Sequence, residues 1–421
     1  MSKYSSSQVQ TQYIDPVAFV PNGRCRFELD ATKAAYLPNM RILNLGCNSN
    51  AATQYNRGLG ALALIKNIRL LDAHTVLSSL REVAPYMFFK SCNASNSENK
   101  SQKSYTRRNG LGLELDSTTN KLANIYPSGT ANLGTAGNES DTAILDLRLV
   151  FPILNELSSI PTSIFKNLVV EIEFQSSTAN QVLTNVGSSV TILRPVLAVD
   201  YMDNMNLVAP LTQELISNGV NWLEVEHDNY VIPAVDTTAY GAADIVEVQS
   251  NNNSLGFIGK SLERLLITKQ IGDKEQELNN NAVLGFSATA SSQALLNQSA
   301  QIRLNGRNIM PGNNGIQGNN ARLGYMVDTW GDLSLNPSAV QYKWDQTASI
   351  LNASHEGGQQ DFIGVMIGSR VQDLQISISR DTVNDTSTKH PTSSQLQVNM
   401  YGEVRKVLSI RADGSYIVVY A

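Results

Sequence analysis

The segment GLGALALIKNIRLLDAHTVL, residues 58–77, admits two interpretations that lead to different proteins. Gly58, Gly60 and Ala63 match the GxGxxA pattern of a dinucleotide-binding turn. That turn needs a strand directly before the first glycine and a helix after it, so that the helix amides face pyrophosphate. The preceding residues form the polar run NSNAATQYNR, and no βαβ alternation follows. We therefore interpret the segment as a loop that enters a strand, IKNIRLL, with a turn near Asp72–His74 and a second strand.

The same strand pattern dominates the rest of the chain. In NLVVEIEF, residues 167–174, Leu168, Val170 and Ile172 point to one face while the two glutamates point to the other. Because successive strand side chains alternate between faces, this pattern is typical of half-buried strands. Similar alternation occurs in TAILDLRLVF (142–151), ILRPVLAVDYM (192–202), NWLEVEHDNYV (221–231), AQIRLNGRNIMPG (300–312), DLQISISRD (373–381) and QLQVNM (395–400). The final stretch KVLSIRADGSYIVVY predicts a hairpin around Asp413–Gly414.

A short helix is predicted between the two groups of strands. In APLTQELISNG, residues 209–219, Pro210 suits a first helical position, Leu211 and Leu215 share a face, and Gly219 is a stop signal. Most other connections are long and polar, namely 91–109, 116–141, 233–260, 311–330 and 381–394. Structureless loops of this length are uncommon unless they are functional. The predicted fold class is all-β, with two β-sandwich domains, long polar loops and a linking helix.

Composition and charge argue against a protein that coats nucleic acid. Of the 421 residues only 16% are charged, and the formal net charge is −5, whereas a protein that neutralises phosphates carries a basic balance. The longest basic cluster, KSQKSYTRR at residues 100–108, is interpreted as a solvated surface loop. No specific nucleic-acid partner is expected.

The cysteines and the N-terminus indicate a protein made inside a cell. Cys25, Cys47 and Cys92 are an odd number without close pairing, which argues against a disulfide framework, and we expect them to be small buried hydrophobic residues. The first residues, MSKYSSSQVQTQY, lack the apolar centre of a signal peptide. No apolar run approaches the roughly 20 residues that a bilayer-spanning helix needs.

A second nucleotide-like motif is SLGFIGKS, residues 254–261. The phosphate-binding pattern GxxxxGK[ST] has glycine where this chain has Ser254. The following LERLLITKQI has mixed periodicity, and no strand that ends in a magnesium-binding aspartate accompanies it. We assign no nucleotide site here.

No catalytic, cofactor-binding or metal-binding set can be assembled from the sequence. None of the four histidines has a partner at metal-ligand spacing; they are His74, His227, His355 and His390. The segment HEGGQ at 355–359 lacks the second histidine of the zinc-binding motif HExxH. Glu224, Glu226 and Asp228 fall on one strand face and offer oxygen ligands for a hard cation. A solvated acidic face is the favoured interpretation, because the wet side of a sheet shows the same alternation. The prediction is therefore no enzyme, no cofactor and no metal.

Four stretches, taken in order, resemble the double jelly-roll major capsid proteins. The strand, turn and strand of residues 60–76 are similar to the first-barrel signature of that family. They most resemble the capsid proteins of polinton-like viruses and virophages. These belong to the lineage that includes adenoviruses and tailless membrane-containing phages. Residues 145–174 resemble late first-barrel strands, and residues 301–313 resemble a second-barrel strand that ends in proline. Residues 403–421 resemble the closing hairpin. The resemblance depends on the order and spacing of these motifs across two halves of about 200 residues each.

The resemblance implies an architecture and a structural role. It implies two tandem eight-stranded jelly rolls, with an N-terminal arm at 1–20, a first jelly roll at 21–205, a linker with a short helix at 206–220 and a second jelly roll at 221–421. It implies homotrimers that act as pseudo-hexagonal capsomers of an icosahedral shell in the virion. Neighbouring capsomers, penton and minor or cement proteins, and an internal membrane beneath the arm are the partners it suggests.

Two other functions fit a pair of β-sandwiches. The first is a carbohydrate-binding or adhesin protein, which the missing secretion signal and the modest aromatic content of 7% disfavour. The second is an enzyme on two metal-binding barrels. That enzyme needs a histidine-rich constellation in each barrel, and four scattered histidines do not supply two of them.

Overall fold

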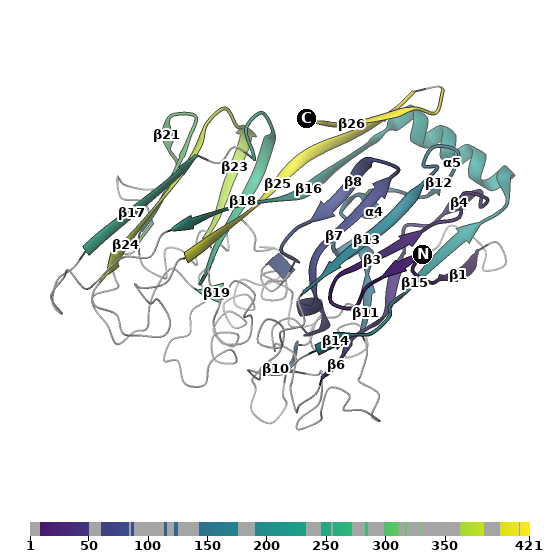
Figure 1. The fold of residues 1–421 in the computed structure, drawn as a ribbon. Helices are drawn as coiled ribbons and strands as arrows, with labels where there is room; N and C mark the ends of the chain where they lie inside the picture. Colours follow the sequence, from purple (N-terminus) through teal and green to yellow (C-terminus); the bar gives the residue numbers. More distant parts are fainter. Residues whose placement is uncertain are drawn as a thin grey trace.

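The computed structural model of the chain describes residues 9–49, 60–83, 86–87, 113–115, 122–124, 143–175, 190–232, 246–253, 256–271, 283–284, 299–310, 316–317, 329, 363–382, 396–411 and 413–421. Strands dominate these residues, and they gather into two neighbouring groups with the helix α5 at one end (Figure 1). We call the group formed by residues 10–202 the first sandwich and the group formed by residues 220–420 the second sandwich.

The first sandwich consists of two antiparallel sheets. One contains β1 (Gln10–Ile14), β15 (Val196–Met202), β4 (Ala35–Tyr36) with β5 (Arg41–Leu45), and β12 (Ile160–Pro161) with β11 (Ala143–Asp146). The other contains β2 (Ala18–Phe19), β3 (Arg24–Glu28), β13 (Leu168–Phe174), β7 (Ile65–Asp72) and β8 (Thr75–Leu80). Two short pairs join β6 (Cys47–Ser49) to β14 (Val190–Ile192) and β9 (Leu113–Leu115) to β10 (Leu122–Asn124).

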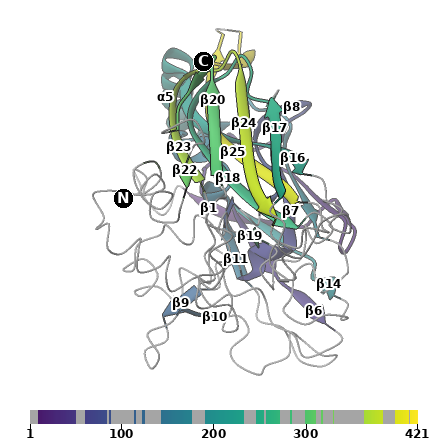
Figure 2. The ribbon, with the colours of Figure 1, turned by 90° about the vertical axis from the view of Figure 1, so that its left-hand side faces the viewer.

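The second sandwich is built in the same way. Its first sheet contains β16 (Val220–Ile232), β25 (Leu396–Ile410), β18 (Ser261–Ile271), β19 (Val283–Leu284), β23 (Ile363–Arg370) and β26 (Tyr416–Tyr420). Its second sheet contains β17 (Val246–Asn253), β24 (Leu374–Thr382), β20 (Ser299–Leu304), β21 (Arg307–Asn308) and β22 (Ile316–Gln317). Figure 2 views this second sheet face on.

The two sandwiches share one connectivity. In chain order the eight strands are β1, β3, β4–β5, β7, β8, β11–β12, β13 and β15 in the first, and β16, β17, β18, β20, β21–β22, β23, β24 and β25 in the second. In each, the first strand pairs with the eighth, the eighth with the third, and the third with the sixth. The second strand pairs with the seventh, the seventh with the fourth, and the fourth with the fifth. This is the connectivity of a jelly roll, and the predicted fold class is confirmed.

Alternating apolar residues explain why these strands form sandwiches. In β13 the side chains of Val170, Ile172 and Phe174 are buried in the core. Glu171 on the opposite face pairs with Arg69 of β7 at 2.9 Å. The opening segment behaves likewise: a 3₁₀ turn, η2 (Gly60–Leu64), leads into β7, and the turn to β8 places Ala73 at φ 52°. The strand, turn and strand predicted there are confirmed.

Several predicted boundaries were wrong. The alternation of TAILDLRLVF ends at Asp146, because the Asp146 carboxylate accepts from the Arg148 amide and caps a 3₁₀ helix, η3 (Leu147–Leu149). The short helix α4 (Ile153–Glu156) follows. The supposed loop 233–260 contains β17, whose run VEVQSNNN is too polar in its second half to stand out as a strand.

The linking helix is longer than the sequence indicates. Helix α5 (Met205–Asn218) begins five residues before Pro210, the predicted first helical position, because the side chain of Asn204 accepts from the Asn206 amide as an N-cap. Pro210 is therefore inside the helix and not at its first position. Gly219 ends the helix at φ 62°, and a Cβ there would lie 2.6 Å from the Leu408 carbonyl oxygen, so only glycine fits.

The N-terminal arm expected at residues 1–20 is partly a sheet strand. Residues Gln10–Ile14 form β1, which pairs along its whole length with Leu197–Tyr201 of β15. Two side-chain bonds reinforce this edge, from Thr11 Oγ1 to Asp200 at 2.6 Å and from Tyr201 OH to Gln10 at 2.6 Å. Its sequence QTQYI has too few apolar residues to reveal the strand by alternation.

Candidate functional site at the junction of the two sandwiches

The two sandwiches meet along the edge strands β8 and β16. Helix α4 also packs against β16, and both contacts bring residues far apart in the chain together (Figure 1). The hydrophobic core of the first sandwich continues across the junction into Trp222, Val225, Tyr401 and Leu408 of the second. One continuous core therefore holds the two sandwiches together.

Glu224 is the polar centre of this junction. Its carboxylate is fully buried and accepts from Ser78 Oγ at 3.0 Å, the Ser79 amide at 2.7 Å and Trp222 Nε1 at 2.7 Å. Burial raises the pKa of Glu224, and the charge of Lys406 and these hydrogen bonds oppose that rise. Since a buried carboxylate is tolerated only when it is well partnered, Glu224 fixes how β16 sits on β8.

Two tyrosines of the second sandwich bond to the first. Tyr401 donates to the Glu82 carbonyl at 2.8 Å, and its ring lies 5.3 Å from that of Tyr86. Tyr416 donates to Asp72 at 2.7 Å, and its ring lies 5.3 Å from Phe165. Burial raises the pKa of Tyr401, so it stays a hydrogen-bond donor at all physiological pH values.

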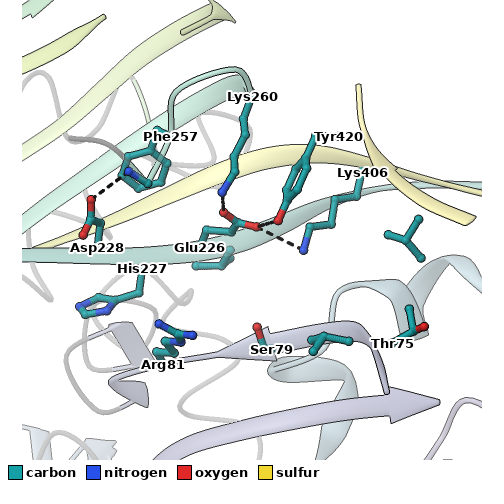
Figure 3. A pocket seen from close by; sticks show the side chains of 14 residues that line it. Thr75, Ser79, Arg81, Glu226, His227, Asp228, Phe257, Lys260, Lys406 and Tyr420 are labelled. Atoms are coloured by element: carbon teal, nitrogen blue, oxygen red, sulfur yellow. Dashed lines mark hydrogen bonds and ion pairs between the residues drawn. The ribbon is translucent and has the colours of Figure 1, made fainter. Parts of the chain in front are cut away.

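A cavity of about 490 Å³ opens beside these contacts, between β8 and the turn that precedes β18 (Figure 3). Glu226 is its central group, which accepts from Lys260, from Tyr420 OH at 2.6 Å and pairs with Lys406 at 3.3 Å. Burial alone would raise the pKa of Glu226, but the bonds from Lys260 and Tyr420 and the two lysine charges outweigh it and lower the pKa. The charged groups around Glu226 in this cavity are therefore already paired with one another.

His227 also lines this cavity. Its ring stands 4.9 Å from the Tyr401 ring, and its Nε2 lies 3.0 Å from Asn399 Oδ1. Burial lowers the pKa of His227 from 6.5 to about 4, although the bond with Asn399 works in the opposite direction. The folded chain therefore carries a neutral imidazole at pH values where the unfolded chain binds a proton.

The free energy of unfolding is consequently expected to fall as the pH falls from 6.5 towards 4. Between these pH values the unfolded chain binds a proton at His227 and the folded chain does not, so acid favours unfolding. The free energy of unfolding therefore falls by up to about 1.4 kcal/mol for each pH unit in this range, and this contribution is fully present above pH 6.5. Urea unfolding at several pH values checks this. The variant His227→Gln should have a shallower slope between pH 6.5 and 4.5, and equal slopes in both proteins would rule out the assignment.

The prediction of a solvated acidic face on residues 224–228 was wrong. Glu224, Glu226 and Asp228 were expected to face solvent, but Glu224 is buried against β8 and Glu226 is held by two lysines. Asp228 instead accepts from the Asn229 amide at 2.9 Å. The alternation is real, but the first sandwich covers Glu224, and lysines of the second sandwich pair with Glu226.

The two nucleotide-like motifs have other geometries. Residues 256–260 form a turn with Gly259 at φ 81°, and β18 follows in place of the helix that a phosphate-binding loop requires. Gly60 starts a 3₁₀ turn that leads into β7. Neither motif aims a helix N-terminus at a phosphate.

The remaining candidates are scattered. Cys25 and Cys47 are buried, and burial raises the pKa of the Cys25 thiol to about 12. His74 lies in the exposed turn before β8, whereas Cys92, His355, His390 and the basic cluster 100–108 lie outside the described residues. Within the described ranges no three His, Cys, Asp or Glu side chains gather as metal ligands, and no helix has the length and apolar character to cross a membrane.

The junction itself could not be found from the sequence. Glu224 and Ser78 are 146 positions apart, and Tyr401 and Glu82 are 319 apart. The segment NWLEVEH does place a tryptophan two residues before a glutamate on one strand face, which indicates that the glutamate is partly buried. The pattern does not show which strand packs against it.

Comparisons with known proteins establish what this fold resembles. No family model matches the sequence, and no curated protein matches it. Among solved structures, PBCV-1 VP54 fitted into a reconstruction of the virophage Sputnik aligns with a TM-score of 0.54 at 10% identity, covering 98% of this chain and 97% of that one. The mavirus major capsid protein aligns with a TM-score of 0.53 at 9% identity, covering 99% and 90%. A quasi-atomic PBCV-1 capsid model gives 0.52 at 12% identity, covering 98% and 97%. The chain therefore has the double jelly-roll fold of these proteins over nearly its whole length.

Proposed function

We propose that this chain is a viral major capsid protein, a structural and non-enzymatic component of the virion. The observation that carries the proposal is the repetition of one eight-stranded connectivity in two sandwiches that share a core. Two of the solved structures that align over nearly the whole chain are named as a virus capsid and as a major capsid protein.

The proposed mechanism is geometric. A chain with two similar sandwiches side by side contributes two of six similar units when three copies form a ring, so a homotrimer has a pseudo-hexagonal outline. Head-to-tail contacts either close into such a ring or grow without limit. A rigid junction favours closure, because it fixes the angle between the two sandwiches, and the buried contacts of Glu224 and Tyr401 supply that rigidity.

The wider assembly is part of the same proposal. Trimers would meet neighbouring trimers across surfaces poor in charge, where amides and hydroxyls pair without the desolvation cost of ions. Penton and minor capsid proteins, and an internal membrane, are the further partners proposed from the resemblance. We also propose the domain division at residues 21–205, 206–220 and 221–421, with β1 added to the first domain.

The oligomeric state tests this function directly. Purified protein is expected to be a homotrimer, with a mass three times that of the 45.9 kDa chain, in light scattering coupled to gel filtration. Each sandwich must bury a large contact in the ring, so the trimer should persist at micromolar concentration. A stable monomer there would contradict the proposal, and glycan binding by such a monomer would favour the adhesin alternative.

A further inference from the structure

We propose that β1 of one copy packs against the β20–β21 hairpin of the next copy, so that these two edges form the contact that closes the trimer. The inference rests on the proposed capsid function, which it deepens by naming the surfaces. It follows from the repeated connectivity and from a contact that the chain already makes within itself.

The template is the junction between β8 and β16. Strand β8 is the fifth strand of the first sandwich and lies at the edge of its sheet, whereas β16 is the first strand of the second sandwich and also lies at an edge. They meet through Ser78, Ser79 and Glu224. The fifth strand of one sandwich therefore rests on the first strand of the next sandwich in the chain.

A ring of six similar sandwiches repeats this contact between copies. The fifth strand of the second sandwich is represented by β21, and the first strand of the first sandwich is β1. Figure 1 places β1 and the sheet that carries β21 on opposite sides of the molecule. That placement suits a head-to-tail contact, because neither edge can reach the other within one copy.

Exposed apolar side chains lie on β1 and on the segment that follows it. Tyr13 on β1 is 67% exposed, and Val17 and Val20, which follow it, are each 60% exposed. Asp15 lies between them in the chain, and its side chain is 75% exposed. Its carboxylate lies 3.8 Å from Arg194, whose side chain is also 58% exposed. Exposed apolar side chains near an accessible carboxylate are typical of a contact surface.

The hairpin side offers the opposite charge. Its turn holds Asn305 at φ 48° and Gly306 at φ 80°, so β21 folds back tightly on β20. Arg303 and Arg307 are both exposed on this hairpin, and neither forms an ion pair with a described carboxylate. Asp15 therefore complements this edge, as Glu224 of β16 complements the donors of β8.

The exposed residues Ile417 and Val419 form a competing apolar surface on β26. That strand is an addition to the eight strands of the second sandwich and has no counterpart in the first. A contact through β26 would not repeat around a ring of similar sandwiches, so the β1 edge is preferred.

A charge swap tests the contact in the full-length chain. Asp15→Arg and Arg307→Asp should each raise the concentration at which half of the trimer dissociates at least about tenfold, because every ring contains three such contacts. The double variant with both changes should recover most of the loss. Glu214→Arg and Lys166→Asp, at exposed positions outside β1 and the β20–β21 hairpin, serve as matched controls and should leave dissociation unchanged.

A cysteine pair gives an independent readout that does not depend on stability. Tyr13→Cys combined with Asn308→Cys should yield disulfide-linked trimers under oxidising conditions, and neither single variant should. If wild-type protein is trimeric but no variant weakens it and no cross-link forms, this inference is overturned while the capsid function stands. If wild-type protein is monomeric, the proposed function itself fails.

Discussion

Replacing Glu224 by alanine is expected to lower the free energy of unfolding by about 3–5 kcal/mol, among the largest effects of any single substitution in this chain. The variant leaves three donors without their acceptor, namely the buried Ser78 hydroxyl and Trp222 Nε1 and the partly buried Ser79 amide. Unpaired buried donors each cost about 1–3 kcal/mol. Urea unfolding at pH 7 measures the loss.

Two further variants separate the causes. Glu224→Gln keeps the side-chain shape and one acceptor oxygen, so its loss should lie between those of wild type and Glu224→Ala. Glu263→Ala removes a partly exposed carboxylate that pairs with Arg405 at 2.6 Å and should cost less than about 1 kcal/mol. Equal losses for Glu224→Ala and Glu263→Ala would show that the junction carboxylate does not join the sandwiches.

Replacing Tyr401 by alanine is expected to cost about 3–5 kcal/mol, because it removes a large, fully buried side chain from the shared core. The ring contacts Tyr86 and His227, and the hydroxyl donates to Glu82 of the first sandwich. The variant should also weaken the trimer, since the angle between the two sandwiches is no longer fixed. Urea unfolding and light scattering measure the two effects.

The hydroxyl and the ring of Tyr401 can be told apart. Tyr401→Phe keeps the ring and should lose only about 1–2 kcal/mol, the cost of leaving the Glu82 carbonyl without its donor. Val231→Ala, at a strand residue that is 51% exposed, should change stability by less than about 0.5 kcal/mol. A Tyr401→Ala protein as stable as Val231→Ala would mean that the two sandwiches fold as independent units.

Much of the fold could be predicted because it depends on local signals. Alternation located β13, β15, β16, β20, β24 and the start of β25, and the Asp413–Gly414 turn located the closing hairpin, in which Gly414 has φ 80°. The glycine pattern at residues 58–63 was interpreted as a loop entering a strand because polar residues precede it, and the described part, Gly60–Leu64, is a 3₁₀ turn that leads into β7. These features need no knowledge of distant contacts.

The candidate site could not be predicted because it depends on which surfaces meet. The acidic face of β16 has the pattern of a solvated strand, but β8 covers Glu224 and two lysines hold Glu226. Strands β1 and β17 were missed because hydrogen bonding to β15 and β24 forms them in spite of polar sequences. Tertiary pairing decides such segments.

Electron microscopy of the purified full-length protein tests the central claim most directly. We expect particles made of three chains whose six sandwiches give a hexagonal outline, packed into hexagonal tiles or closed shells. Particles that contain one chain, or rings in which each chain contributes only one sandwich, would contradict this account.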